Sequence, residues 1–221
     1  VALIISLATA PFDLWWAPKR IATLTQEGGL ELGARMWGIG TALVIVAGTG
    51  VALGGPLLIH LLFPAGYGGA YGYLYPLVLL QGAHIITTFT NVGSYARSNG
   101  SYVFAIEAFS AAIAVTGYAF LVEPSGVNGV MASMAAGQVI RFALHLWLGK
   151  ELAPLPYPWI PALASIAGAV LLVILAPDAA DLLWRFLYGL IAAPILIGVI
   201  IASGLVQVPA AFLATLRRRF C

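Results

Sequence analysis

The feature that most constrains this chain is a series of long apolar runs, separated by short interruptions of proline, glycine and charge. Of the 221 residues, 62% are hydrophobic and 8% are Asp, Glu, Lys or Arg. In soluble domains about a quarter of the residues are charged. This chain therefore lacks the polar side chains that would cover a core in water. The composition excludes a soluble globular fold and a disordered chain, and it predicts a polytopic helical membrane protein.

The interruptions set the number of expected helices. A helix needs about 20 apolar residues to cross the hydrocarbon of a bilayer, and the chain divides into about seven segments of that kind. We therefore expect an all-α bundle of about seven transmembrane helices. The expected spans are residues 1–17, 33–61, 73–95, 102–122, 127–148, 159–176 and 182–207.

Basic residues gather at alternate ends of these segments, and basic loops are retained in the cytoplasm. The connections after the first, third and fifth segments and the C-terminal tail contain Lys19, Arg20, Arg35, Arg97, Lys150 and the arginines at 217–219. Arg141 lies in the cytoplasmic third of its span, and Arg185 alone disagrees. The pattern predicts that the first residue is outside and the C-terminus is cytoplasmic, with the basic tail against anionic lipid.

Polar side chains recur at helical spacing in four of the segments. These stripes are Gln81, His84, Thr88, Asn91 and Tyr95; Gln138, Arg141 and His145; Ser6, Thr9 and Asp13; and Glu107 with Ser110. A charged or amide side chain costs a few kcal/mol at the bilayer centre unless it faces protein or water. The stripes therefore predict an enclosed hydrophilic cavity near the cytoplasmic half of the bundle.

Structural roles stay open for the same residues. Amide side chains often do no more than bond a neighbouring helix, and Arg141 and Glu107 can pair with each other as a lock. Small residues predict close helix contacts at two places. These are the interleaved pairs Ala132, Ser133, Ala136 and Gly137, and the pair Gly50 and Gly54.

The sequence lacks the motifs of several common catalytic and metal sites. The chain contains no phosphate-binding P-loop, HExxH metal site or GxSxG nucleophile turn. Its net charge of +2 supplies no basic field for a nucleic acid, and its one cysteine, Cys221, excludes an internal disulfide and a Cys-based zinc site. We expect no catalytic residue, cofactor, metal or nucleic-acid partner. A membrane-embedded enzyme with His84 or Asp13 as a base stays an alternative.

Four stretches within residues 13–150 carry a family resemblance when they are taken in order. They are WWAPKRIATLTQEGGLELGARMW, LLFPAGYGGAYGYLYPLVLLQG, TNVGSYARSNGSY and SAAIAVTGYAFLVEPSGVNGVMAS. The first is similar to a proline-containing helix that leads through a loop into an Ala-Arg helix start. The second is similar to an outer turn followed by a Leu-rich helix, the third to a short Gly-containing loop between two helices, and the fourth to a helix that ends in an outer turn. Together they resemble the polysaccharide flippases of the multidrug/oligosaccharidyl-lipid/polysaccharide exporter superfamily.

The resemblance implies a division of the chain. Residues 1–150 would form a C-terminal flippase lobe that is truncated at its N-terminal side, residues 151–208 two additional transmembrane helices, and residues 209–221 a basic cytoplasmic tail. We expect that the upstream part of a longer protein, the N-terminal lobe, is missing, because the chain opens with Val1 inside an apolar run.

The resemblance also implies a function. Such a protein is a transporter and not an enzyme, and it carries a lipid-linked oligosaccharide or polysaccharide precursor, such as that of O-antigen, across the bacterial cytoplasmic membrane by alternating access. The implied partners are this substrate, membrane lipids, the N-terminal lobe and the machinery that polymerises or ligates the polysaccharide in lipopolysaccharide synthesis.

Residue roles follow from the same resemblance, because a pyrophosphate-linked sugar needs a polar, partly cationic cavity. The candidates for substrate binding are Arg141, Gln138 and His145 at the head group or glycan, Arg35 and Arg97 at the inner mouth, and Gln81 and Asn91. The candidates for ion or proton coupling are Asp13, Glu107 and His84. Alternatives are a drug or cation exporter of the same superfamily, a membrane-embedded enzyme that modifies glycans or lipids, and a fragment without activity.

Overall fold

The computed structural model describes residues 2–63, 69–96, 100–178 and 181–207. Within these ranges the protein is all-helical, with no β-strand, as the sequence predicts. The elements are α1 (Ile4–Trp16), α2 (Arg20–Leu24), α3 (Gly29–Leu62), α4 (Tyr71–Thr90), the 3₁₀ helix η2 (Asn91–Tyr95), α5 (Gly100–Leu152), α6 (Trp159–Ile174) and α7 (Leu182–Ala202). The basic tail expected at 209–221 lies outside these ranges.

Each of the seven expected segments contains a helix, and the differences concern the ends. The short helix α2 occupies the first connection, and α3 begins at Gly29, one turn before the expected start. Helix α4 passes into the tighter helix η2, which completes the segment expected at 73–95. Helix α7 ends at Ala202, and Gly204, with φ 80°, turns the chain away.

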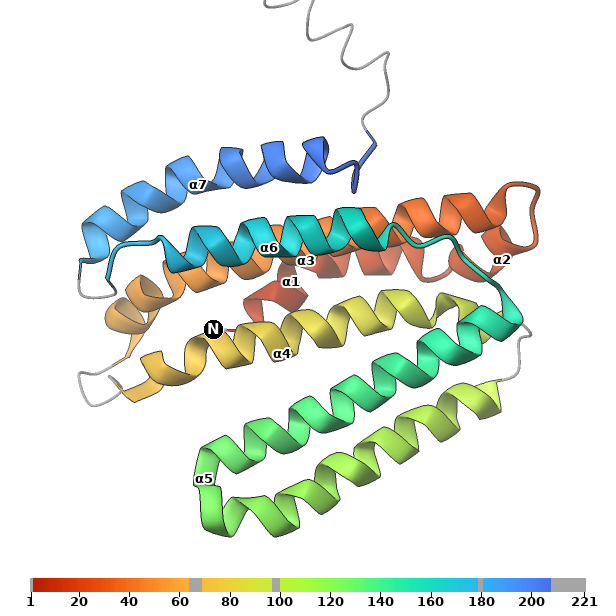
Figure 1. The fold of residues 1–221 in the computed structure, drawn as a ribbon, viewed down its shortest axis with the longest axis horizontal. Helices are drawn as coiled ribbons and strands as arrows, with labels where there is room; N and C mark the ends of the chain where they lie inside the picture. The colour runs from red at the N-terminus through yellow and green to blue at the C-terminus, as the bar shows by residue number, and fades with distance from the viewer. Residues whose placement is uncertain (1, 64–68, 97–99, 179–180, 208–221) are drawn as a thin grey trace, which may run out of the picture.

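Helix α5 is a hairpin of two arms, residues 100–125 and 127–152, which lie side by side in Figure 1. The chain reverses at Gly126, whose φ of 54° and ψ of −133° only glycine adopts without strain. The arms approach closely where a Cβ on Gly137 would lie 2.9 Å from the carbonyl oxygen of Ser110. The helix contact predicted from Ser133 and Gly137 is thus confirmed, whereas Ala132 and Ala136 face outward.

Helix α3 is the centre of the fold. It packs against α1, α4, α6 and α7, whereas the α5 hairpin packs on α4 and η2. In Figure 1, α6 overlies α3, α7 lies on one side of this pair, and α4 followed by the hairpin lies on the other. The hairpin and α7 are therefore at opposite margins of the molecule.

Aromatic side chains join α3 to the segment before α6. The ring of Trp37 lies 5.1 Å from the ring of Tyr157 and 4.9 Å from that of Trp159. Trp37 Nε1 donates a hydrogen bond to Thr90 Oγ1 (2.8 Å), and the Tyr157 hydroxyl donates to the Thr90 carbonyl (3.1 Å). Burial raises the pKa of the Tyr157 hydroxyl above its usual range, so this donor keeps its proton.

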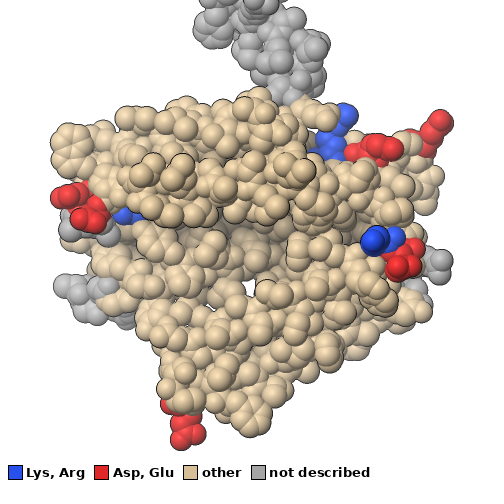
Figure 2. Space-filling model, viewed as in Figure 1, with Lys and Arg blue, Asp and Glu red and all other residues tan. Residues whose placement is uncertain are grey.

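The outer surface is apolar over most of its extent. Large side chains such as Phe104, Phe120 and Ile160 are exposed by 74%, 74% and 82%. On the face in Figure 2, acidic and basic side chains lie at two ends and near the turn of the α5 hairpin, and the surface between them is uncharged. Helices α3, α5 and α7 are long and apolar enough to cross a membrane. Monomeric soluble proteins rarely expose apolar surface of this extent.

Arg185 fixes α7 to the rest of the bundle. Its side chain is buried and donates to the carbonyl oxygens of Leu53 (3.1 Å), Ala52 (3.3 Å) and Pro177 (2.6 Å) and to the Tyr75 hydroxyl (2.5 Å). The Ala52 oxygen needs such a donor, because Pro56 has no N–H to bond it within α3. This burial also explains why Arg185 disagrees with the topology pattern: it is not a loop charge.

We expect Arg185→Met to destabilise the protein by about 3 kcal/mol, because buried acceptors left without a donor cost about 1–3 kcal/mol each. The measurement is the thermal unfolding midpoint in detergent, followed by circular dichroism. Arg35→Met is the matched control, because Arg35 is exposed and has no partner in the ranges given above. Equal midpoints for the two variants would show that the guanidinium does not hold α7.

Candidate functional site

Five of the predicted site residues meet between α4 and the two arms of α5. They are His84 on α4, Glu107 on the first arm, and Gln138, Arg141 and His145 on the second arm. We call this group the α4–α5 cluster. It is held by the hairpin, because the turn at Gly126 brings Glu107 opposite Arg141 and His145.

The ion pair of Arg141 and Glu107 is the centre of the cluster. Arg141 Nε lies 2.9 Å from Glu107 Oε1 and 2.8 Å from Oε2, and Arg141 Nη1 lies 3.1 Å from His84 Nδ1. The arginine side chain is 10% exposed and the glutamate side chain 40%. Because Nε serves both carboxylate oxygens, Nη2 has no acceptor among the residues that the structure describes.

His145 extends the cluster to η2. Its ring is fully buried, with Nε2 3.2 Å from Glu107 Oε1 and Nδ1 3.1 Å from Ser94 Oγ. A neutral ring with its proton on Nε2 satisfies both contacts, because it donates to the carboxylate and accepts from the hydroxyl. Glu107 therefore holds two residues of the second arm.

Gln138 joins the second arm to α4. Its Nε2 donates to Thr87 Oγ1 (2.5 Å) and to the Ala83 carbonyl (3.1 Å). This is the bond to a neighbouring helix that membrane amides often make.

The other predicted site residues lie away from the cluster. Gln81 donates to Ser6 Oγ (2.7 Å) on α1, and Asn91 Oδ1 accepts from Arg20 Nη1 (3.2 Å) at α2. Asp13 is half-buried and has no side-chain partner in the described part of the chain, and Arg35 is exposed on α3. Arg97 lies outside the described residues.

The expected single enclosed hydrophilic cavity is therefore wrong for these residues. Helix α4 packs between α1 and α5, so the polar residues along its length bond different neighbours. Within the cluster the polar groups bond one another directly, and His84 and Glu107 lie at its exposed margin. The cluster is an open polar face and not a closed chamber.

Sequence reasoning missed two residues that hold these groups. Thr87 and Ser94, and not Thr88 and Tyr95, bond the α5 hairpin, so the predicted stripe is one residue out of register at these two positions. Thr88 bonds its own helix at the His84 carbonyl, and Tyr95 lies under the Arg20 guanidinium at 4.8 Å. The seven-residue spacing of Thr87 and Ser94 was the available signal.

Comparison with known proteins adds no relative. A scan of protein-family models, a search of curated proteins and a search of solved structures each give no match. In the described ranges, no three His, Cys, Asp or Glu side chains converge as ligands for a metal ion. The chemistry that the cluster offers is hydrogen bonding to an anion at Arg141 and proton exchange at its histidines and carboxylate.

We expect Glu107→Gln to destabilise the protein by roughly 1–3 kcal/mol, because Arg141 and His145 lose a charged acceptor. The matched control is Glu123→Gln, since Glu123 is exposed on the same helix and has no described partner. That variant is expected to stay within about 0.5 kcal/mol of the parent. The measurement is the unfolding midpoint in detergent; a shift shared equally by both variants would contradict the proposed importance of the ion pair.

Proposed function

We propose that this chain is a membrane-embedded lobe of a polysaccharide flippase, which moves a lipid-linked oligosaccharide across the bacterial cytoplasmic membrane by alternating access. The observation that carries the proposal is Arg141, a nearly buried arginine that Glu107 engages through Nε alone. Its Nη2 stays available to an acceptor outside the described chain. A phosphate or sugar oxygen is an acceptor of this kind.

The charge of the cluster argues against a cationic cargo. One carboxylate, Glu107, faces one permanent cation, Arg141, beside the imidazoles of His84 and His145. With neutral imidazoles the cluster carries no excess of negative charge, whereas a site for a cationic drug needs an excess of acids. The balance supports the flippase over the drug or cation exporter.

The exposed margin of the cluster supports a second lobe. His84 is exposed and Glu107 is 40% exposed on a surface whose other side chains are largely apolar. A charge that faced lipid there would cost a few kcal/mol. A second lobe, or a wet cavity between two lobes, removes this cost, and it fits the arrangement of transporters that work by rocking two halves about a central site.

Proton coupling is the role that fits the acidic and imidazole groups. Glu107 contacts both Arg141 and His145, so a proton on Glu107 releases the arginine for the cargo phosphate. His84, at the margin, is the group that exchanges protons with water. Asp13 has no partner in the described residues and is a second candidate for coupling.

We expect Arg141→Gln to reduce export of the lipid-linked glycan at least about ten-fold, because a charge-assisted contact to phosphate contributes about 1.5–3 kcal/mol. The measurement is the fraction of lipid-linked oligosaccharide that membrane-impermeant periodate oxidises in intact cells expressing the full-length protein. Protein levels in the membrane are compared in parallel.

The matched control for Arg141→Gln is Lys150→Gln, which removes an exposed basic residue near the end of the same arm of α5. It should leave export unchanged. Unchanged export in Arg141→Gln would remove Arg141 from the substrate site. Chemical change in the lipid-linked sugar, in place of its transfer to the outer leaflet, would favour the membrane-embedded enzyme.

The orientation has a direct test, because Cys221 is the one cysteine in the chain. With a cytoplasmic C-terminus, a membrane-impermeant maleimide should label Cys221 only after the cells are permeabilised. In a Cys221→Ser background, Glu123→Cys at the exposed tip of the α5 hairpin should be labelled in intact cells. The opposite pattern would invert the proposed topology.

A further inference from the structure

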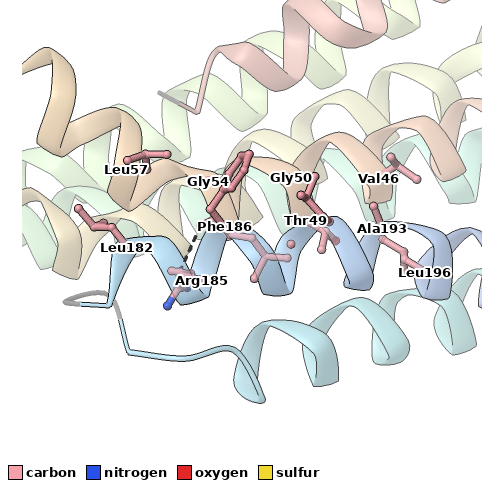
Figure 3. A pocket seen from close by; sticks show the side chains of 13 residues that line it. Val46, Thr49, Gly50, Gly54, Leu57, Leu182, Arg185, Phe186, Ala193 and Leu196 are labelled. Atoms are coloured by element: carbon pink, nitrogen blue, oxygen red, sulfur yellow. Dashed lines mark hydrogen bonds between the residues drawn. The ribbon is translucent and has the colours of Figure 1, made fainter.

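A groove runs between α3 and α7 (Figure 3). Helix α7 lies at the margin of the molecule opposite the α5 hairpin (Figure 1). Its volume is about 250 Å³. The lining is almost entirely apolar and includes Val46, Gly50, Leu53, Phe186, Leu190 and Ala193. Figure 3 shows Gly50, Gly54 and Thr49 of α3 along one wall and Phe186 and Ala193 of α7 along the other.

The groove exists because two glycines do not pack. Gly50 and Gly54 were expected to make a close helix contact, but a Cβ on either one would meet nothing within 4 Å. The expected close contact is not formed. Arg185 bonds the N-terminal part of α7 to the Leu53 and Ala52 carbonyls of α3, and α7 does not pack against Gly50 and Gly54. Apolar walls without packing partners lose dispersion contacts, and inside a bilayer a lipid acyl chain supplies them.

A charged group lies at one end of the groove. Arg185 lines it, is 4% exposed and donates only to neutral oxygens, so no carboxylate compensates its charge. A guanidinium has five N–H donors, and these four contacts leave one Nη1 N–H for another acceptor.

Two acidic residues precede this buried cation in the segment that leads into α7. Asp178 and Asp181 are exposed and have no side-chain partner within the described ranges. The backbone brings them together with Arg185: the amide of Asp181 bonds the Asp178 carbonyl (3.0 Å), and the amide of Arg185 bonds the Asp181 carbonyl (2.9 Å). The buried positive charge that lines the groove is thus preceded, along the backbone that enters α7, by two exposed acidic residues.

We propose that the α3–α7 groove binds phosphatidylethanolamine, with one acyl chain between α3 and α7, its phosphate at Arg185 and its ammonium group at Asp178 and Asp181. The order of charges in this headgroup matches the order of charges in the site. An anionic lipid such as phosphatidylglycerol places no cation against the carboxylates, and the quaternary ammonium of phosphatidylcholine donates no hydrogen bond to them. The inference rests on the membrane location in the proposed function but not on transport.

The test is native mass spectrometry of the full chain in detergent, titrated separately with phosphatidylethanolamine, phosphatidylglycerol and phosphatidylcholine. We expect phosphatidylethanolamine to bind with a Kd about ten-fold lower than phosphatidylglycerol, with phosphatidylcholine between them. Gly50→Leu should raise the Kd for phosphatidylethanolamine at least about ten-fold, because its side chain displaces two or three methylenes of the lipid from the groove.

The matched control for Gly50→Leu is Gly198→Leu. Gly198 is an exposed glycine on α7 whose Cβ would also meet nothing within 4 Å, but it does not line the groove. It should keep the parent Kd. The double variant Asp178→Asn with Asp181→Asn should bring the ratio of the two Kd values, phosphatidylglycerol over phosphatidylethanolamine, to about one.

Equal Kd values for the three lipids, or an equal loss in Gly50→Leu and Gly198→Leu, would overturn the lipid site. A helical circular dichroism spectrum for each variant separates lost binding from lost folding. Transport does not enter this measurement. A chain that inserts into membranes and shows no lipid preference contradicts only the groove, whereas a chain that does not insert contradicts the proposed function as well.

Discussion

Buried polar groups cost free energy unless they find hydrogen-bond partners, and this constraint shapes both margins of the bundle. Arg185 finds backbone carbonyls, one of which Pro56 leaves free, and so α7 is bound to α3. Arg141 finds Glu107, and so the second arm of α5 is bound to the first. Pro56 leaves the Ala52 carbonyl without its usual N–H donor in α3, and Arg185 donates a hydrogen bond to that carbonyl. The free carbonyl and the buried guanidinium thus give each other a hydrogen-bond partner.

The sequence predicts the helices well because apolar runs and their interruptions decide where helices start and end in this composition. It also predicts most of the α4–α5 cluster, since Gln138, Arg141 and His145 recur at helical spacing. It does not predict which neighbour each polar residue meets. Gln81 and His84 lie on adjacent turns of α4 but bond α1 and α5 respectively, and only the packing of α4 between those helices decides that.

Small residues show the same limit. Gly137 lies against Ser110 in the α5 hairpin, whereas Gly50 and Gly54, with the same spacing motif as Ser133 and Gly137, face open space. A small residue permits a close approach but does not cause one. In the hairpin, the turn at Gly126 and the Arg141–Glu107 pair bring the arms together. Helix α7 is held at Arg185, and nothing comparable draws it onto Gly50.

The two buried arginines differ in whether the groups that accept their hydrogen bonds can change charge. Arg185 donates to four oxygens of fixed position, three of them backbone carbonyls that no proton can neutralise. Arg141 donates to a half-exposed carboxylate and an exposed imidazole, both of which titrate. Partners that change charge can release an arginine and take it back, and partners that do not change charge hold it permanently. The proposed transport cycle needs the first kind of contact at its substrate site, and the scaffold that carries the site needs the second.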